Sequence, residues 1–196
     1  MMIGEMMKAI LVILFVSLSF LFSQEYHVSK ADKNEVKFIS DAPLEDFEGV
    51  TDKIDGYLYF ENGDFTVNSQ LYFEIDLKSL DTGIGLRNRH MRDNYLHTDK
   101  YPSTHFKGKI VKAEKTADNQ FNVTSEGVIF IHGIERPLTV NGKLTTMDDR
   151  IQIQCQFEVK LSDFNIPIPQ LMFMKINEVM DLRLNFYLKR FDAKDK

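Results

Sequence analysis

The sequence of 196 residues contains no tryptophan and only one cysteine, Cys155. A single cysteine excludes an internal disulfide, so the fold must rely on its hydrophobic core, which a single domain of this length can build. Cys155 lies in an alternating run of apolar residues from Ile151 to Val159. We therefore predict that it is a small buried hydrophobic residue.

Positive charge is scarce as well. The chain has 24 Lys and Arg residues against 29 Asp and Glu residues, a net charge of −5. An acidic domain is repelled by a phosphate backbone, so nucleic acid is excluded as an expected partner.

No apolar run reaches the roughly 20 residues that a membrane-spanning helix needs. The run from Ala9 to Phe22 follows Lys8 and has 14 residues, mostly apolar. A charged start, a short apolar run and a small residue at its end predict a secretory signal peptide over residues 1–23, which leaves a mature domain of residues 24–196. Cleavage after Ser19 and an uncleaved N-terminal anchor are the alternatives.

The rest of the chain is rich in alternating apolar and polar residues, which are typical of strands with one buried face. The predicted strands are residues 35–40, 53–61, 65–77, 104–113, 120–131, 136–147, 150–161 and 179–190. Several neighbouring strands are separated by turn residues, for example by Asn62-Gly63-Asp64. Eight amphipathic strands with short connections predict an all-β fold, an antiparallel barrel or sandwich.

One helix interrupts this pattern between the third and fourth strands. The stretch from Arg87 to Pro102 is polar but spaces a few apolar residues at helical intervals, and Tyr101-Pro102 is expected to end it. Such a helix inserted into an all-β chain is predicted to be a lid on a barrel, opposite the irregular stretch that contains Pro167 and Pro169.

Aromatic residues are abundant, with 16 Phe and 7 Tyr, and many of the Phe residues fall on the predicted inner face. An eight-stranded barrel is either filled by side chains or lined by them around one small ligand. Glycines on the inner face mark bends or close approach. A filled aromatic core and a ligand tunnel both fit; the inner glycines are Gly56, Gly108, Gly127 and Gly142.

No set of residues predicts catalysis or a metal site. Asp81-Thr82-Gly83 resembles an aspartic-protease motif, but such enzymes need two carboxylates and the chain has no second copy. His90, His97 and His105 lack the spacing of metal ligands. Serine-nucleophile motifs and phosphate loops are absent, so we expect neither an enzyme nor a bound metal or other cofactor.

Several segments, in their order and spacing, resemble the bacterial YceI-like family. They are Ile75–Gly83, His90-Met91-Arg92, Tyr95-Leu96, Lys100-Tyr101-Pro102, Phe106-Lys107-Gly108, Gly127–Ile134 and Asp163–Ile166. The chain departs from the family at Asn34-Glu35, where His-Ser is usual, and at Leu161-Ser162, where an arginine is common.

The resemblance implies an eight-stranded antiparallel lipocalin-like barrel that is exported to the periplasm of a Gram-negative bacterium. It also implies that the barrel holds a polyisoprenoid chain, such as the tail of a quinone. A filled barrel without a ligand, acting as a structural or interaction protein, is the alternative. Transient contact with a membrane and a homodimer are both compatible with this prediction.

The residues predicted to line the tunnel or its mouth are apolar or aromatic and come from the strands and the inserted helix. They are Phe60, Phe65, Leu71, Phe73, Ile75, Met91, Tyr95, Phe106, Ile129, Ile131, Phe157, Leu184 and Phe186. The helix around Met91–Leu96 and the loop around Ile166–Phe173 are expected to close the mouths.

Overall fold

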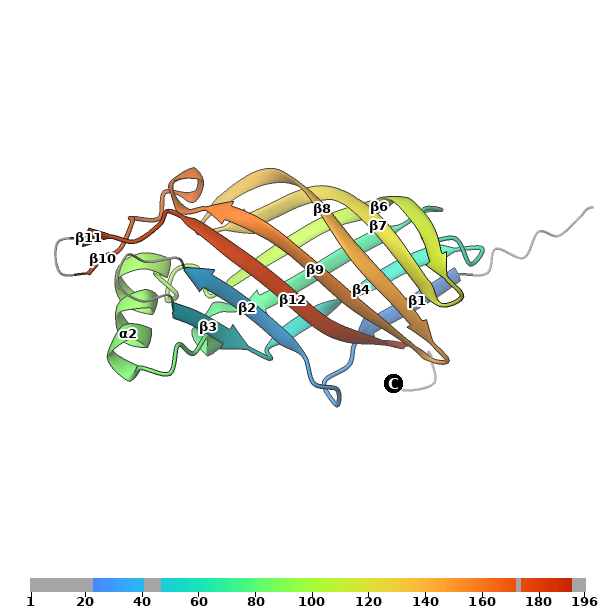
Figure 1. The fold of residues 1–196 in the computed structure, drawn as a ribbon, viewed down its shortest axis with the longest axis horizontal. Helices are drawn as coiled ribbons and strands as arrows, with labels where there is room; N and C mark the ends of the chain where they lie inside the picture. The colour runs from blue at the N-terminus through green and yellow to red at the C-terminus, as the bar shows by residue number, and fades with distance from the viewer. Residues whose placement is uncertain (1–22, 41–46, 172–173, 192–196) are drawn as a thin grey trace, which may run out of the picture.

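The structure, a computed structural model, describes residues 23–40, 47–171 and 174–191. Its dominant feature is a closed antiparallel β-barrel with a helical segment and a small hairpin at one end (Figure 1). The predicted eight-stranded antiparallel lipocalin-like barrel with one inserted helix is confirmed. In the described part of the chain, no helix is both long and apolar enough to cross a membrane.

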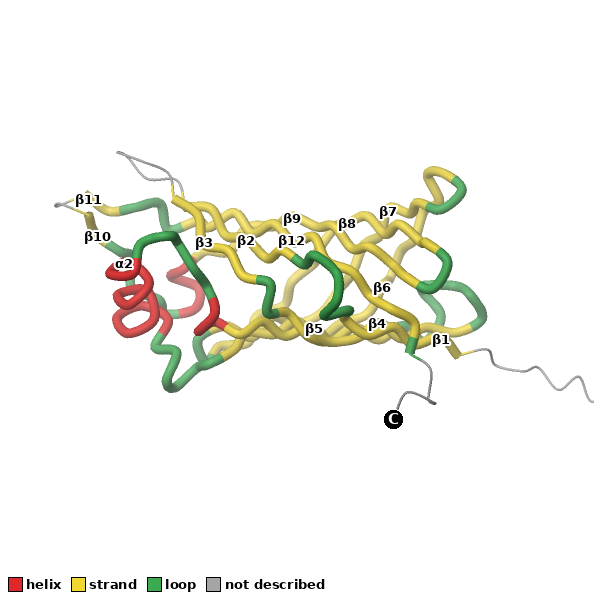
Figure 2. The backbone as a smooth tube through the Cα atoms, turned by 90° about the horizontal axis from the view of Figure 1, so that it is seen from below, coloured by secondary structure: helices red, strands yellow, loops and turns green. Residues whose placement is uncertain are grey.

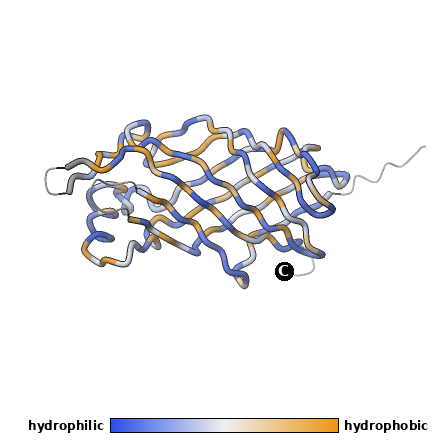
Figure 3. The backbone as a smooth tube through the Cα atoms, in the orientation of Figure 1, coloured by the Kyte–Doolittle hydropathy of each residue, from blue (hydrophilic) through white to orange (hydrophobic). Residues whose placement is uncertain are grey.

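Eight strands form the closed ring, and each pairs with its neighbours in an antiparallel sense. In ring order they are β1 (Ser23–Val28), β4 (Ile54–Glu61), β5 (Gln70–Asp76), β6 (Ser103–Ala117), β7 (Gln120–Ile131), β8 (Ile134–Met147), β9 (Arg150–Lys160) and β12 (Val179–Arg190). Pairing of β1 with the end of β12, from Tyr26↔Arg190 to Val28↔Leu188, closes the ring. Hydrophobic and hydrophilic positions alternate along these strands (Figure 3).

Two strands lie beside the ring. Strand β2 (Glu35–Ser40) pairs with the first half of β12, and β3 (Phe47–Thr51) pairs with β2. The predicted strand at residues 35–40 is present and pairs with β12, but the ring of eight closes through β1. The prediction had no strand at residues 23–28 and treated residues 47–51 as a loop.

The predicted long strand over residues 65–77 is shorter than expected. Residues 65–68 form turns, in which the Asp64 carboxylate accepts hydrogen bonds from the Thr66 N–H and hydroxyl, both at 2.8 Å. Strand β5 therefore begins only at Gln70. The local hydrogen bonds of Asp64 favour a turn over the extended conformation that the alternation suggested.

The inserted helix is present and begins two residues before Arg87. It consists of α2 (Gly85–His90) and a π-helical turn, η3 (Met91–Leu96). It ends at His97, whose backbone is left-handed (φ 47°), so the predicted end at Tyr101-Pro102 was too late. Figure 2 shows the helical segment beside the end of the barrel that also carries the small hairpin of β10 (Gln170–Leu171) and β11 (Met174–Lys175).

The two halves of the barrel have separate hydrophobic clusters. The half farther from the helix is filled by aromatic rings, with Phe60 and Phe65 at 4.6 Å and Phe65 and Phe121 at 5.2 Å between ring centroids. We call the three residues Phe60, Phe65 and Phe121 the aromatic plug. The second cluster, which includes Ile129, Ile131 and Met180, lies in the half nearer the helix.

The wall of the barrel is incomplete in this second half. Strands β8 and β9 pair only from Gly142↔Cys155 to Met147↔Arg150, so the first half of β8 and the end of β9 are not hydrogen-bonded to each other. The short helix η4 (Leu161–Phe164) spans the separation, because Arg136 on β8 donates a hydrogen bond to the Asp163 carbonyl at 3.1 Å.

Candidate functional site

A cavity of about 730 Å³ occupies the half of the barrel nearer the helix. Its wall is almost entirely apolar, and it reaches the surface beside α2, where the lining residues Ile84 and Leu86 are exposed. The volume lies within the range of small-molecule binding sites, about 300–1,000 Å³. The barrel is therefore filled at one end and open at the other. The filled aromatic core and the tunnel, which the sequence left as alternatives, both occur in one molecule.

Of the thirteen residues predicted to line the tunnel, eleven lie on the cavity wall. They are Leu71, Phe73, Ile75, Met91, Tyr95, Phe106, Ile129, Ile131, Phe157, Leu184 and Phe186. The other two, Phe60 and Phe65, do not reach the cavity. They belong to the aromatic plug and are almost fully buried, at 3% and 6% exposure, because the cavity ends before their level in the barrel.

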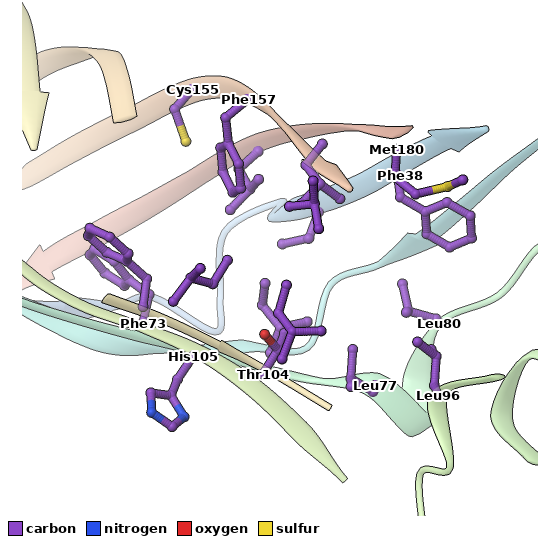
Figure 4. Close-up of a pocket in the computed structure, with 18 of the residues that line it drawn as sticks. Phe38, Phe73, Leu77, Leu80, Leu96, Thr104, His105, Cys155, Phe157 and Met180 are labelled. Atoms are coloured by element: carbon purple, nitrogen blue, oxygen red, sulfur yellow. The ribbon is translucent and has the colours of Figure 1, made fainter. Parts of the chain in front are cut away.

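Cross-strand pairing explains how the wall residues face one another. Phe73 on β5 is opposite Phe106 on β6, and Phe106 is opposite Ile129 on β7. On the other side of the barrel, Phe157 on β9 is opposite Leu182 on β12. Figure 4 shows Phe73 of β5 and Phe157 of β9 approaching the same space from two different strands of the barrel.

Gly108 and Gly127 make room for one of these rings. They pair directly across β6 and β7, and a Cβ on either would lie 2.8 Å from Cζ of Phe106. The Phe106 ring therefore rests on two residues without side chains. The sequence correctly indicated close approach at these inner glycines.

Several wall residues were not predicted. The β2–β3 hairpin contributes Val36, Phe38 and Phe47, and the approach to the helix contributes Leu77 and Leu80. Figure 4 shows Phe38, Met180, Leu80 and Leu96 together near the mouth. Alternation within β8 could have indicated Leu138 and Val140, whereas the hairpin residues become wall residues only through tertiary packing.

The helical segment forms one side of the mouth. Met91, Tyr95 and Leu96 line the cavity from η3. Ile166 and Pro169 line it from the loop after η4, while Met172 and Phe173 of the predicted loop lie outside the described residues. Both predicted closing elements therefore contribute to the same cavity and not to separate mouths.

Asp81-Thr82-Gly83 fixes the start of the helix and shows no catalytic arrangement. The Asp81 carboxylate accepts hydrogen bonds from the Asn88 side-chain amide at 2.7 Å and the Gly83 N–H at 2.8 Å. These bonds lower the pKa of Asp81. The Asn88 side-chain carbonyl in turn accepts from the N–H and hydroxyl of Thr82, at 2.8 and 2.7 Å.

The histidines noted in the sequence do not converge. His97 Nδ1 lies 2.8 Å from His132 Nε2, which ties the end of η3 to the β7–β8 turn. His105 points away from the cavity (Figure 4) and stacks on Phe130 at 4.9 Å, and His90 is exposed on α2. Within residues 23–40, 47–171 and 174–191, no three metal-ligating side chains come together.

Cys155 lies on the cavity wall opposite Leu184 of β12. It is half-buried and not fully buried as predicted. Burial raises the pKa of its thiol to about 12. The predicted small hydrophobic role agrees with a thiol that stays protonated at neutral pH.

The cavity is suited to enclosing an apolar molecule. Its few polar wall groups include Thr104, whose hydroxyl donates to the Phe130 carbonyl at 2.5 Å, and Ser125. Among the described residues, no nucleophilic side chain on the wall is hydrogen-bonded to a basic side chain. Nucleophilic catalysis would need such a pair. The arrangement suits an extended apolar molecule.

Comparison with known proteins places this fold. The model of the YceI-like domain matches residues 26–188. Burkholderia cenocepacia BcnA is 19% identical, with a TM-score of 0.67, and the match covers 82% of this chain and 98% of that chain. A polyisoprenoid binding domain from Saccharophagus degradans, implicated in plant cell wall breakdown, is 16% identical, with a TM-score of 0.65 and coverages of 84% and 97%.

The Campylobacter jejuni YCEI protein is 19% identical, with a TM-score of 0.54, and the match covers 74% of this chain and 85% of that chain. A search of curated protein sequences found no match. The family match extends over most of the chain, from within β1 to within β12. The chain belongs to the YceI-like family.

Proposed function

We propose that the protein binds one long-chain apolar lipid, of the polyisoprenoid or quinone type, and carries or stores it in the periplasm. The single observation that carries this proposal is the apolar cavity of about 730 Å³, which is blind at the aromatic plug and open at the helix. The structural neighbour described as a polyisoprenoid binding domain supports the same class of ligand.

Physical chemistry favours such a ligand. Each buried CH₂ group contributes about 0.8 kcal/mol, so several isoprene units can outweigh the cost of ordering the ligand. The one permanently charged side chain on the wall is Arg87 of α2, whose guanidinium already donates hydrogen bonds to Thr82. Export through residues 1–23 as a signal peptide is part of the proposal and would bring the protein into the compartment between two membranes.

A filled barrel that acts only as a structural or interaction protein is disfavoured by the open half of the interior. Protein interiors are normally packed to the density of organic crystals, and voids larger than a water molecule are few. An empty volume of this size, enclosed by Phe73, Phe106 and Phe157, is expected where another molecule completes the packing.

The direct experiment is solvent extraction of protein purified from its native host, followed by mass spectrometry of the extract. We expect about one apolar lipid per protein molecule. Repeated absence of such a lipid, together with no uptake of added ubiquinone by the purified protein, would overturn the proposal.

A matched pair of variants ties the ligand to the cavity. Phe73→Glu places a carboxylate on the cavity wall, and we expect a folded protein that no longer retains lipid. Val128→Glu introduces the same charge on the outer face of β7, where Val128 is 39% exposed, and should retain it. Circular dichroism checks the fold of both; equal retention by two folded variants would contradict the assignment.

A further inference from the structure

Two large hydrophobic side chains at the cavity mouth are unusually exposed. Ile84 and Leu86, which flank the first residue of α2, are 53% and 60% exposed. The other exposed large hydrophobic residues among the described ones, Val111, Val128 and Met147, reach only 38–39%. Both Ile84 and Leu86 also border the opening of the cavity.

Hydrogen bonds fix the backbone that carries these two side chains. Asn88, one turn further along α2, is buried and binds Thr82 and Asp81, and the Asn88 N–H donates to the Ile84 carbonyl at 2.9 Å. The start of the helix is thus fixed on both sides of Gly85. A rigidly presented apolar pair at a site opening is typical of an interaction surface.

The charge around this pair has the opposite sign to that of the molecule. From Ile84 to Arg92 the chain has three arginines and no Asp or Glu, although the net charge of the whole chain is −5. Arg87 donates hydrogen bonds to Thr82 and Arg92 to the Leu80 carbonyl, so both bind neutral groups. Arg89 is exposed.

None of the three arginines forms a salt bridge with a described residue. The nearest acidic groups in the sequence are Asp81 and Asp93, on either side of the segment. Among the described residues, Arg87 and Arg89 next to the apolar pair thus have no salt bridge, whereas the charge of Arg92 acts on Asp81.

We infer that the cavity mouth docks on the surface of a bilayer that contains anionic phospholipids. Ile84 and Leu86 enter the headgroup region, and Arg89 faces the lipid phosphates. Basic residues around exposed apolar side chains bind such surfaces by combining apolar burial with electrostatic attraction. This inference rests on the proposed function, because a docked mouth lets an apolar ligand pass between bilayer and cavity without crossing water.

The placement of the ends of the barrel agrees with this orientation. Strand β1 begins at Ser23 at the end of the barrel opposite the helix (Figure 1). Docking through α2 therefore presents the cavity to the membrane and directs the aromatic plug and the start of β1 away from it.

A local fluorescence measurement tests the docking. An environment-sensitive dye is attached to Leu86→Cys or, as a control, to Val128→Cys on the barrel side. Both variants also carry Cys155→Ala, so that the introduced cysteine is the only thiol in the protein. With vesicles of phosphatidylglycerol and phosphatidylcholine we expect a blue shift at position 86 only, much weaker with pure phosphatidylcholine or high salt. No shift at position 86, or equal shifts at both positions, would overturn the inference and leave a protein partner as the alternative.

A kinetic measurement separates failure of docking from failure of ligand binding. Arg89 does not line the cavity, so Arg89→Glu should take up ubiquinone to the same equilibrium level as the wild type. We expect its transfer rate from anionic vesicles to fall about tenfold, with Arg89→Lys restoring it. The control Lys109→Glu makes the same charge change on the exposed outer face of β6.

The two proposals predict different outcomes here. If no variant and no wild-type protein takes up ubiquinone from any source, the proposed function fails. If uptake is normal but Arg89→Glu and Lys109→Glu transfer at the same rate, lipid binding stands and membrane docking is overturned.

Discussion

Cys155 shows how the position of one side chain decides its chemistry. The thiol is on the wall of an apolar cavity, where the charged thiolate is poorly solvated, and its pKa rises to about 12. A thiol reacts as the thiolate, so this cysteine is chemically inert at neutral pH. The alternating sequence around it indicated the apolar setting but not the neighbouring cavity.

We predict that the raised pKa of Cys155 makes stability fall at alkaline pH. The unfolded thiol, with a pKa of about 8.5, loses its proton first. The stabilising contribution is therefore complete below about pH 8.5 and is lost as the pH rises towards 12. Urea unfolding of the wild type and Cys155→Ala across this range measures the effect; the difference in unfolding free energy should shrink as pH rises.

The same measurement has an independent check. Thiol reagents at pH 8 should leave the folded protein unmodified and should modify Cys155 quickly in urea. Rapid labelling of the folded protein would show that the cavity is open to water at Cys155 and that the pKa is not raised.

At the residue level, the sequence predicted which side chains point into the barrel. It did not predict whether they line the cavity or belong to the packed half. Alternation predicts which strand residues point inward, and nine of the eleven strand residues predicted to line the tunnel do lie on the cavity wall. It cannot distinguish the open half of a barrel from the packed half, because Phe60 and Phe73 have the same pattern. That difference depends on which rings meet across the barrel.

At the scale of elements, β6 and β7 pair Gly108 directly with Gly127. A Cβ on Gly127 would lie 2.3 Å from the Lys107 carbonyl oxygen and 2.7 Å from Cα of Gly108. Both neighbours are backbone atoms, which cannot move aside as a flexible side chain does. The strand pair therefore depends on the absence of a side chain here.

We predict that Gly127→Ala destabilises the barrel by about 1–3 kcal/mol, the usual cost of overpacking. Urea unfolding followed by circular dichroism gives the value. Gly85→Ala is the control, since no atom lies within 4 Å of the position that its Cβ would take. A loss of stability as large in Gly85→Ala as in Gly127→Ala would contradict this explanation.

Element prediction failed where a strand is short or depends on a distant partner. β1 has six residues and only Tyr26 and Val28 are apolar and buried, so no clear alternation marks it. β3 exists because it pairs with β2, and its Gly49 lies against the Phe38 ring. Long strands such as β7 and β12 were predicted over their full lengths because the periodic signal accumulates with length.

At the scale of the whole molecule, one half of the barrel is closely packed and the other half holds the cavity. The aromatic plug and the residues around it are closely packed, whereas the other half leaves a cavity among Phe73, Phe106 and Phe157. Side chains that are fully surrounded by protein lose both burial and packing when truncated. Side chains that face an opening lose less.

We therefore expect opposite effects from two similar truncations. Phe60→Ala in the plug should cost about 3–5 kcal/mol of unfolding free energy and leave ubiquinone uptake intact in the folded fraction. Phe157→Ala on the cavity wall should cost clearly less and change uptake. Chemical denaturation and equilibrium ubiquinone binding, measured on the same samples, test both expectations. An equal loss of unfolding free energy in the two variants would refute the distinction between the packed half and the cavity half.

The blind end of the cavity has one more consequence. Leu71, Leu144 and Phe186 belong both to the cavity wall and to the packed cluster, so they form a floor. A chain molecule that enters from the mouth stops when its tip reaches this floor, and any further carbon atoms stay outside. We therefore expect the barrel to select its ligand by tail length, and a single larger or smaller side chain on the floor to change the length that fits.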